Sequence, residues 1–194
     1  MSLGNPLGNA MANPLGLISK AAGGVKIQTG HQFGPAGSPT TARFPLKKIN
    51  LNKSVVFANF QGAGSDGGNI TQSFYFLSLE EEAITFVSQN APSNGYWPVV
   101  SWTILEIESI KRITRVSVGI PGGTTSRSGL TPFPEGTNAE KTIVVPILQQ
   151  TGVAGQQPID ACVRMTPTGF QLDRGLWTTA QLGVIYLCQI VEFE

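Results

Sequence analysis

Short runs of apolar and β-branched residues, separated by Gly, Pro, Asn or Ser, recur along most of the chain. Runs of this length and composition predict β-strands joined by turns. The first six predicted strands lie at 24–30, 42–47, 53–60, 70–79, 83–89 and 97–108. The next six lie at 110–119, 130–134, 141–149, 160–165, 169–173 and 180–193. No helical period lasts for three turns, so the pattern predicts an all-β protein without a long helix.

The two series of strands share short motifs in the same order. The segment 53–56 (KSVV) recurs 88 positions later as 141–144 (KTIV), and 102–107 (WTILEI) recurs 86 positions later as 188–193 (CQIVEF). A third match places 25–28 (VKIQ) opposite 115–118 (RVSV). We therefore predict two tandem antiparallel β-sandwich repeats, at 24–108 and 109–194.

The last strand of each repeat is apolar on both faces. A strand in an antiparallel sandwich normally turns one polar face to water. Something must therefore cover the second face, either the other repeat or a neighbouring subunit. On this ground the residues predicted to form an oligomer interface are Trp102, Ile104, Ile107, Tyr186, Ile190 and Phe193.

Residues 1–23 combine a Pro- and Gly-rich composition with apolar side chains and contain NPLG twice. Proline and glycine at this density oppose a helix or a regular strand. The segment is still too apolar for a plain linker, and we predict an extended arm that docks on another subunit. A frayed or artificial end is the alternative. The docking residues would be Leu3, Leu7, Leu15, Leu17 and Ile18.

Amino-acid composition indicates a folded protein that binds neither nucleic acid nor a membrane. Of the 194 residues, 41% are apolar and 13% charged, which supports a folded core and opposes disorder. The net charge of +1 gives no electrostatic footprint for nucleic acid, and we read Lys47-Lys48 and Lys111-Arg112 as solvated strand ends. No apolar run reaches the ~20 residues of a membrane span, and the N-terminus does not resemble a signal peptide. We expect synthesis and assembly in a cytoplasm, with no membrane insertion.

The two cysteines, Cys162 and Cys188, do not form a set of metal ligands, because neither a CxxC motif nor a partner histidine accompanies them. Pairing across neighbouring strands is one interpretation. Two buried small apolar residues is the interpretation we favour for a reducing compartment.

The glycine-rich segments fit ordered loops. The stretch 61–69 lies between two predicted strands, opens no helix and lacks the Lys-Ser/Thr ending of a phosphate-binding loop. Asp66 and Asn69 supply too few oxygen ligands for calcium, so we predict no metal and no cofactor. In 165–169 we predict a hairpin turn with Gly169 at positive φ.

No motif assembles a catalytic site. The single histidine, His31, lies in a loop-like run with no motif that supplies a partner. Glu80, Glu81 and Glu82 are adjacent, as in a solvated hairpin tip, whereas catalytic carboxylate pairs come from separate elements. We therefore predict that the protein is not an enzyme, with a glycan depolymerase as the enzymatic alternative.

Aromatic residues next to predicted loops are the candidates for ligand binding. Tyr96 and Trp97 precede the last strand of the first repeat, and Trp177, with Arg174 nearby, precedes the last strand of the second. Exposed aromatic rings at loop tips stack on sugars or anchor protein interfaces. The alternative is that these rings cap the sandwich core.

The segments 40–44 (TTARF), 53–56 (KSVV) and 188–193 (CQIVEF) also suggest a family. The pattern resembles small tail-fibre and virion proteins of bacteriophages whose domains are similar to the H-type lectin sandwich. The resemblance implies a six-stranded antiparallel sandwich that assembles as a homotrimer around its closing strands. Carbohydrate-contacting residues of the lectin do not carry over to this sequence, and duplication within one chain departs from the single-domain pattern.

The resulting expectation is a structural component of a tailed-bacteriophage virion, in the tail, baseplate or collar. It would be localised in the virion after assembly in the host cytoplasm, and would bind other virion proteins through its N-terminal arm. A head decoration protein is one alternative. A carbohydrate-binding module that recognises a host surface glycan is another.

Overall fold

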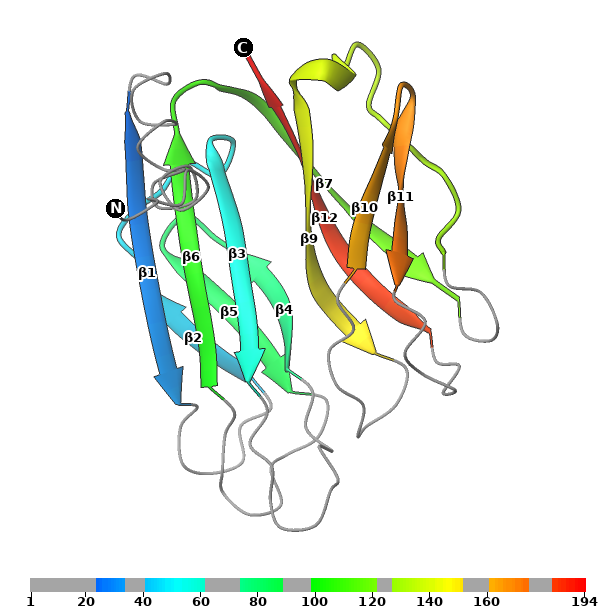
Figure 1. Ribbon diagram of the computed structural model, residues 1–194. Coiled ribbons are helices and arrows are strands. Elements are labelled where there is room, and N and C mark those ends of the chain that lie inside the picture. Colours follow the sequence, from blue (N-terminus) through cyan, green and yellow to red (C-terminus); the bar gives the residue numbers. More distant parts are fainter. Residues whose placement is uncertain are drawn as a thin grey trace, which may run out of the picture.

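The computed structural model describes residues 24–33, 41–61, 74–88, 99–121, 127–151, 161–174 and 183–194. In these ranges the chain forms twelve β-strands and one short 3-10 helix, η1 (Ala139–Lys141) (Figure 1). The all-β prediction is confirmed, and every predicted strand has an observed counterpart within a few residues of the predicted range.

The first half of the chain folds into two antiparallel three-stranded sheets. One has the order β1 (Val25–Phe33), β6 (Val99–Ile107), β3 (Ser54–Gln61), and the other has the order β2 (Thr41–Pro45), β5 (Ala83–Ser88), β4 (Phe74–Leu79). Residues alternate between buried and exposed along β2, as the two-residue period of a strand requires. Phe44, Phe86, Trp102 and Ile104 meet between the two sheets and form the core of this half.

The second half has the same strand order. Its first sheet consists of β7 (Ile110–Ile120), β12 (Val184–Phe193) and β9 (Thr142–Thr151), and its second of β8 (Thr131–Pro132), β11 (Gly169–Arg174) and β10 (Ala161–Thr166). The central strand of each first sheet, β6 or β12, is the last strand of its half. Phe170, Leu172, Tyr186 and Cys188 lie in the core between these sheets.

Strand register fixes which positions of the two halves correspond. Ile27 on β1 pairs with Leu105, and Ile113 on β7 pairs with Val191, so both members of the pair are displaced by 86 positions. The predicted match of 25–28 with 115–118 is therefore wrong by four positions. That match rested on short apolar alternation alone, which fits a strand in more than one register.

The two halves are joined by a connection of only two residues, Glu108 and Ser109, between β6 and β7. The Lys53 ammonium donates to the carbonyl oxygen of Glu108 at 2.8 Å and to that of Ile110, so one partly buried lysine side chain holds both sides of the connection.

Next to this connection the halves share an apolar cluster. Val55, Leu105 and Ile107 come from the first half, and Ile110 and Val191 come from the second. The cluster buries the ends of both closing strands and packs the halves into one body.

The second half also covers one side of the first. We call the face of the β7–β12–β9 sheet that points away from β11 its outer face; it carries Arg115, Ile147 and Gln189. This outer face packs against the side of the first half that is bordered by the edge strands β3 and β4, and Ile147 enters the core of the first half. Figure 1 shows β9 beside β4 and β3.

The contact between the halves explains why the closing strands are apolar on both faces. Alternate residues of β6 and β12 face the core of their own half and the residues between them face the other half, at least near the connection. The predicted oligomer-interface residues are therefore placed inside a single chain, where they offer no free surface to a partner. Trp102, Ile104, Ile107, Tyr186 and Ile190 are at most 9% exposed, and Phe193 is partly buried.

Two glycines are required by close packing. Gly30 on β1 pairs with Trp102 on β6, and the Trp102 ring lies over it. A Cβ atom on Gly30 would lie 2.2 Å from Cζ2 of that ring. A Cβ on Gly169 would lie 2.2 Å from the carbonyl oxygen of Thr131 on β8. The predicted β10–β11 hairpin is present, but Gly169 does not have the predicted positive φ. Its role is to admit the backbone of β8.

Candidate functional site

The aromatic residues predicted to bind a ligand, Tyr96, Trp97 and Trp177, lie outside the described residues, and so does the predicted docking arm with its five apolar residues. Arg174 is the last residue of β11, and its side chain is also outside the description. The structure therefore does not bring these candidates together or separate them.

The strand ends next to these candidates do have defined positions. Val99, which begins β6, pairs with Phe33 and Gln61 at the ends of β1 and β3. In the second half, Arg174 ends β11 and Val184 begins β12. All these strand ends lie at the same end of the molecule, the lower end in Figure 1.

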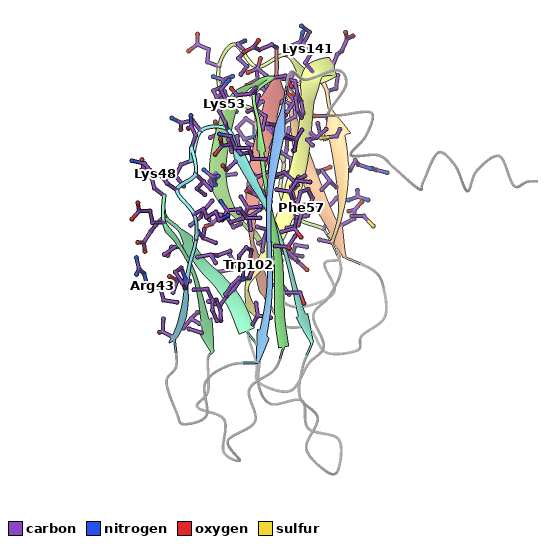
Figure 2. The ribbon with its side chains drawn as sticks, turned by 90° about the vertical axis from the view of Figure 1, so that its left-hand side faces the viewer. Arg43, Lys48, Lys53, Phe57, Trp102 and Lys141 are labelled. Atoms are coloured by element: carbon purple, nitrogen blue, oxygen red, sulfur yellow. The ribbon has the colours of Figure 1, made fainter. Side chains whose placement is uncertain are left out.

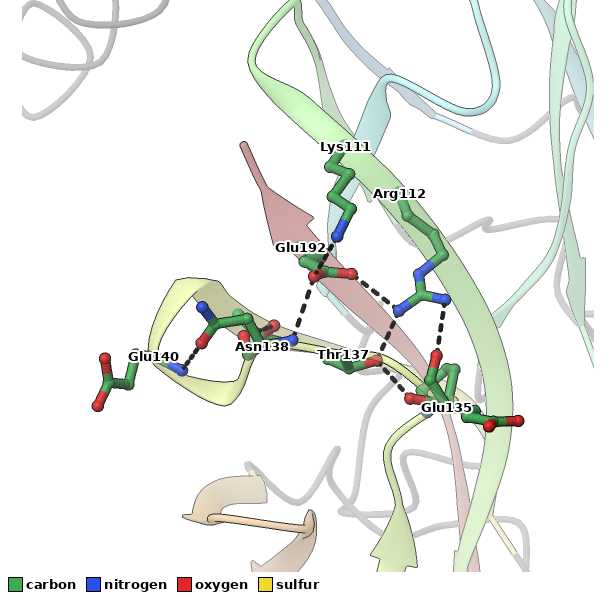
Figure 3. Close-up of polar contacts among 9 residues, drawn as sticks. Lys111, Arg112, Glu135, Thr137, Asn138, Glu140 and Glu192 are labelled. Carbon is green, nitrogen blue, oxygen red and sulfur yellow. Dashed lines mark hydrogen bonds and ion pairs between the residues drawn. The ribbon is translucent and has the colours of Figure 1, made fainter.

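The most elaborate polar arrangement surrounds Glu192 on β12. One carboxylate oxygen accepts from the Lys111 ammonium at 3.0 Å and from the backbone N–H of Asn138 at 3.1 Å. The other accepts from the Arg112 guanidinium at 2.8 Å. Arg112 also donates to Thr137 Oγ1 at 2.7 Å (Figure 3). The carboxylate is nearly inaccessible, and these donors, Lys111 first, hold the pKa of Glu192 below its ordinary value against the opposing effect of burial.

Local turns present the donors to this carboxylate. Gly136 has φ of +73° at the third position of a turn closed by a bond from Thr137 N–H to the Pro134 carbonyl, a conformation that favours glycine. Asn138 then caps η1, because its side-chain oxygen accepts from the N–H of Glu140 at 3.0 Å.

The first half contains the same arrangement around Glu106. Its carboxylate accepts from the Lys26 ammonium at 2.6 Å and from the backbone N–H of Asn50 at 2.8 Å, and its pKa is lowered, with the Lys26 bond as the main cause. The Asn50 side chain accepts from the N–H of Asn52, just as Asn138 accepts from Glu140. Each carboxylate thus fastens the loop before β3 or β9 to the closing strand of its half.

These carboxylates are anchors of the fold. Each oxygen already accepts a charged or backbone donor, and the two side chains are only 8% and 2% exposed, so neither group has the access that a general base needs. The prediction that Lys111-Arg112 is only a solvated strand end is therefore wrong, because both cations bind Glu192. A sequence signal did exist: Glu occurs at the same position, near the end of a mostly apolar closing strand, in both repeats.

The remaining titratable candidates are also placed. His31 belongs to strand β1, opposite Ser101, and not to a loop as predicted. The three glutamates do form the turn between β4 and β5. Glu80 pairs with Arg43 at 2.8 Å and Glu81 with Lys48 at 3.3 Å, both at the surface.

The cysteines are both free thiols. Cys188 is buried in the core of the second half, and burial raises the pKa of its thiol to about 12. Cys162 is exposed on β10, so the interpretation of two buried cysteines is wrong for this residue. It lies on the outward-pointing side of the strand, whereas its neighbours Ala161 and Val163 pack on the core.

Comparison with protein-family models, curated proteins and solved structures found no match to this chain. Within the described ranges, no helix has the length and hydropathy of a membrane span. Among the same residues, the acidic, histidine and cysteine side chains form no group of three or more that could hold a metal ion.

A feature that sequence reasoning missed is a set of exposed large apolar side chains on the strands. Ile27 and Phe57 lie on one face of the β1–β6–β3 sheet, and Figure 2 shows Phe57 on the side opposite to Trp102. Ile143 on β9, Met165 on β10 and Leu130 before β8 are also exposed. Alternation along a strand predicts which residues share a face, but it does not reveal which face remains uncovered in the folded chain.

Proposed function

We propose that this chain is a structural component of a tailed-bacteriophage virion, built from two tandem H-type-lectin-like sandwich repeats, and that it acts by assembly. The observation that carries the proposal is the packing of two halves of identical strand order into one body through a buried apolar cluster and polar contacts. The placement in a tail, baseplate or collar comes from the resemblance of 40–44, 53–56 and 188–193 to phage fibre and virion proteins.

In this proposal the chain forms a homotrimer and its N-terminal arm docks on other virion proteins. The trimer contacts must use residues other than the buried set on the closing strands, because those side chains are occupied within the chain. Exposed side chains on the outer strands are the available alternative.

Quantitative peptide mass spectrometry of gradient-purified phage particles from the source tests the proposal. We expect the protein to be present at a few per cent of the major capsid protein. An abundance near that of the capsid protein would favour a head decoration protein instead. Absence from purified particles would refute the virion function.

A carbohydrate-binding module is the second candidate. It is favoured by the strand ends beside Tyr96, Trp97 and Trp177, which meet at one end of both halves. Glycan-array binding compared between wild type, Trp97→Ala and Trp177→Ala tests it. Loss of binding with unchanged mass in solution would support this function, whereas loss of the oligomer would place the rings in a core or interface.

A further inference from the structure

In the contact between the two halves, the face of a sheet in one half packs against the edge of the sandwich in the other, so each half uses a different surface. The second half contributes the outer face of its β7–β12–β9 sheet. The first half contributes the side bordered by its edge strand β3. The Gln189 side chain binds both backbone groups of Val56 on that edge, with Val56 N–H to Oε1 at 3.0 Å and Nε2 to the Val56 carbonyl at 2.7 Å. Arg115 donates to the carbonyl oxygen of Ser54 at 2.7 Å.

A contact of this type leaves part of one surface of each kind unused. The first half has its own outer face, on the side of the β1–β6–β3 sheet that points away from β5. Next to the connection this face belongs to the shared cluster, through Val55, Leu105 and Ile107, whereas Ile27 and Phe57 on the same face remain exposed. The second half has its own edge, bordered by β9 and β10. Because the two halves have the same strand order, these are the same two surfaces that already pack together once within the chain.

Exposure at corresponding positions separates used surfaces from unused ones. On the edge strands, the outer-face side chain of Val55 on β3 is 2% exposed, while that of Ile143, 88 positions later on β9, is 47% exposed. Ile113 and Val145, on the outer face of the second half, pack against the shared cluster that buries Val55. Their counterparts in the first half, Ile27 and Phe57, are 48% and 43% exposed.

We propose that a second copy of this chain docks the β9 edge of its second half on the outer face of the β1–β6–β3 sheet, and so repeats between molecules the contact that joins the halves within one. Continuity with the existing contact identifies a second copy as the occupant. The exposed Ile143 corresponds to Val55, which the existing contact buries. Ile27 and Phe57 correspond to Ile113 and Val145, which pack against the cluster around Val55. An exposed aromatic side chain such as Phe57 on the face of a sheet is typical of protein interfaces.

The proposed contact differs from the internal one in its polar groups. Thr29 and Thr103 occupy the positions that correspond to Arg115 and Gln189, so the two side chains that bind the β3 edge are not duplicated. We therefore expect a weaker contact than the internal one, formed by apolar side chains and reversible on dilution. Since the two surfaces are different, the association is head-to-tail, which closes into a ring or continues as a filament.

The experiment is sedimentation velocity of the full chain over a range of concentrations, with a face variant (Phe57→Glu) and an edge variant (Ile143→Glu). Leu130→Glu is the matched control, because Leu130 is 52% exposed but belongs to neither surface. We expect the wild type and the control to associate, and the face and edge variants each to sediment as monomers.

Mixing the face variant with the edge variant is the decisive arm. Each retains one intact surface, so an equimolar mixture should form a heterodimer and nothing larger. Circular dichroism and urea unfolding verify that each variant is folded, and Phe57→Thr with Ile143→Thr replaces any variant that is not.

Several results would overturn the proposal. One is a wild-type protein that stays monomeric at every concentration. If Phe57→Glu then also lowers the urea midpoint, another part of the same chain covers Phe57, and the proposal fails for that reason. Another is association lost only in Phe57→Glu with no complementation, which would indicate a face-to-face dimer. The inference rests on the assembly role proposed above, but the two fail separately. A monomer found in virions removes this interface and the homotrimer but keeps the virion function, and an oligomer absent from virions removes only the virion function.

Discussion

Gln189 provides a direct test of how the halves are held together, and the chain contains its own matched control. Gln189 is fully buried and binds both backbone groups of Val56. Gln28 makes the same pair of bonds with Lys47, at 2.9 Å from the Lys47 N–H and 2.8 Å to its carbonyl, but at the surface. Methionine at either position keeps the length and flexibility of the side chain and removes both bonds.

The expected losses differ because water can replace one partner and not the other. Gln189→Met leaves a buried N–H and a buried carbonyl unsatisfied, each at a cost of ~1–3 kcal/mol, so we expect the free energy of unfolding to fall by about 2–4 kcal/mol after relaxation. In Gln28→Met, solvent binds the freed Lys47 groups, and we expect a loss of less than about 1 kcal/mol.

Urea unfolding followed by circular dichroism measures both variants. With a slope of ~2 kcal/mol per molar urea, the Gln189 variant should lower the midpoint by about 1–2 M and the Gln28 variant by less than about 0.5 M. Equal losses in the two variants would refute the reasoning, because burial of the freed backbone groups would then not decide the cost. A Gln189 variant as stable as the wild type would show that its two bonds do not hold the β3 edge.

Three further predictions concern single sites. The lowered pKa of Glu192 stabilises the fold fully above the ordinary carboxyl value of 4.5 and progressively less as pH falls below it, so urea midpoints should decrease on acidification and Glu192→Gln should flatten that decrease. Gly169→Ala should cost about 1–3 kcal/mol in urea unfolding because its Cβ would meet the β8 backbone, whereas Gly129→Ala, with no atom within 4 Å, should be nearly neutral; equal effects would contradict this. A thiol reagent should label Cys162 alone in the native protein and also Cys188 once urea unfolds it, and rapid native labelling of both would refute the burial of Cys188.

Most of the secondary structure could be predicted from the sequence because it depends on local properties. Two-residue alternation, as in the buried Ala42 and Phe44 of β2, and turn-forming residues at the strand ends fix where strands lie. The duplicated KSVV and WTILEI motifs also fixed the correspondence of β3 with β9 and of β6 with β12. The β1–β7 correspondence was wrong because its match consisted of alternation without a distinctive residue.

Contacts between distant strands could not be predicted in this way. Gln189 and Arg115 have the pattern of polar residues on a water-facing side of a strand, and only the packing of one half on the other buries Gln189 and partly buries Arg115. The position of Glu192 carried more information, because a charged residue within a buried closing strand needs cations and N–H donors nearby. Its partners Lys111 and Arg112 were in the sequence as a doublet, but their role depends on the pairing of β7 with β12.

The differences between the two repeats follow from their unequal surroundings. Core positions such as Trp102 and Cys188 differ because each half packs its own core, whereas differences on the outer faces accompany the contact between the halves. In this chain Gln189 covers a strand edge and its counterpart Thr103 does not, while Val145 is partly buried and its counterpart Phe57 is exposed. The anchor carboxylates, which lie within each half, are the same residue type in both, Glu106 and Glu192. The anchor carboxylates thus keep their residue type in both copies, whereas Gln189 and Thr103 differ where only one of the two covers an edge of the other half.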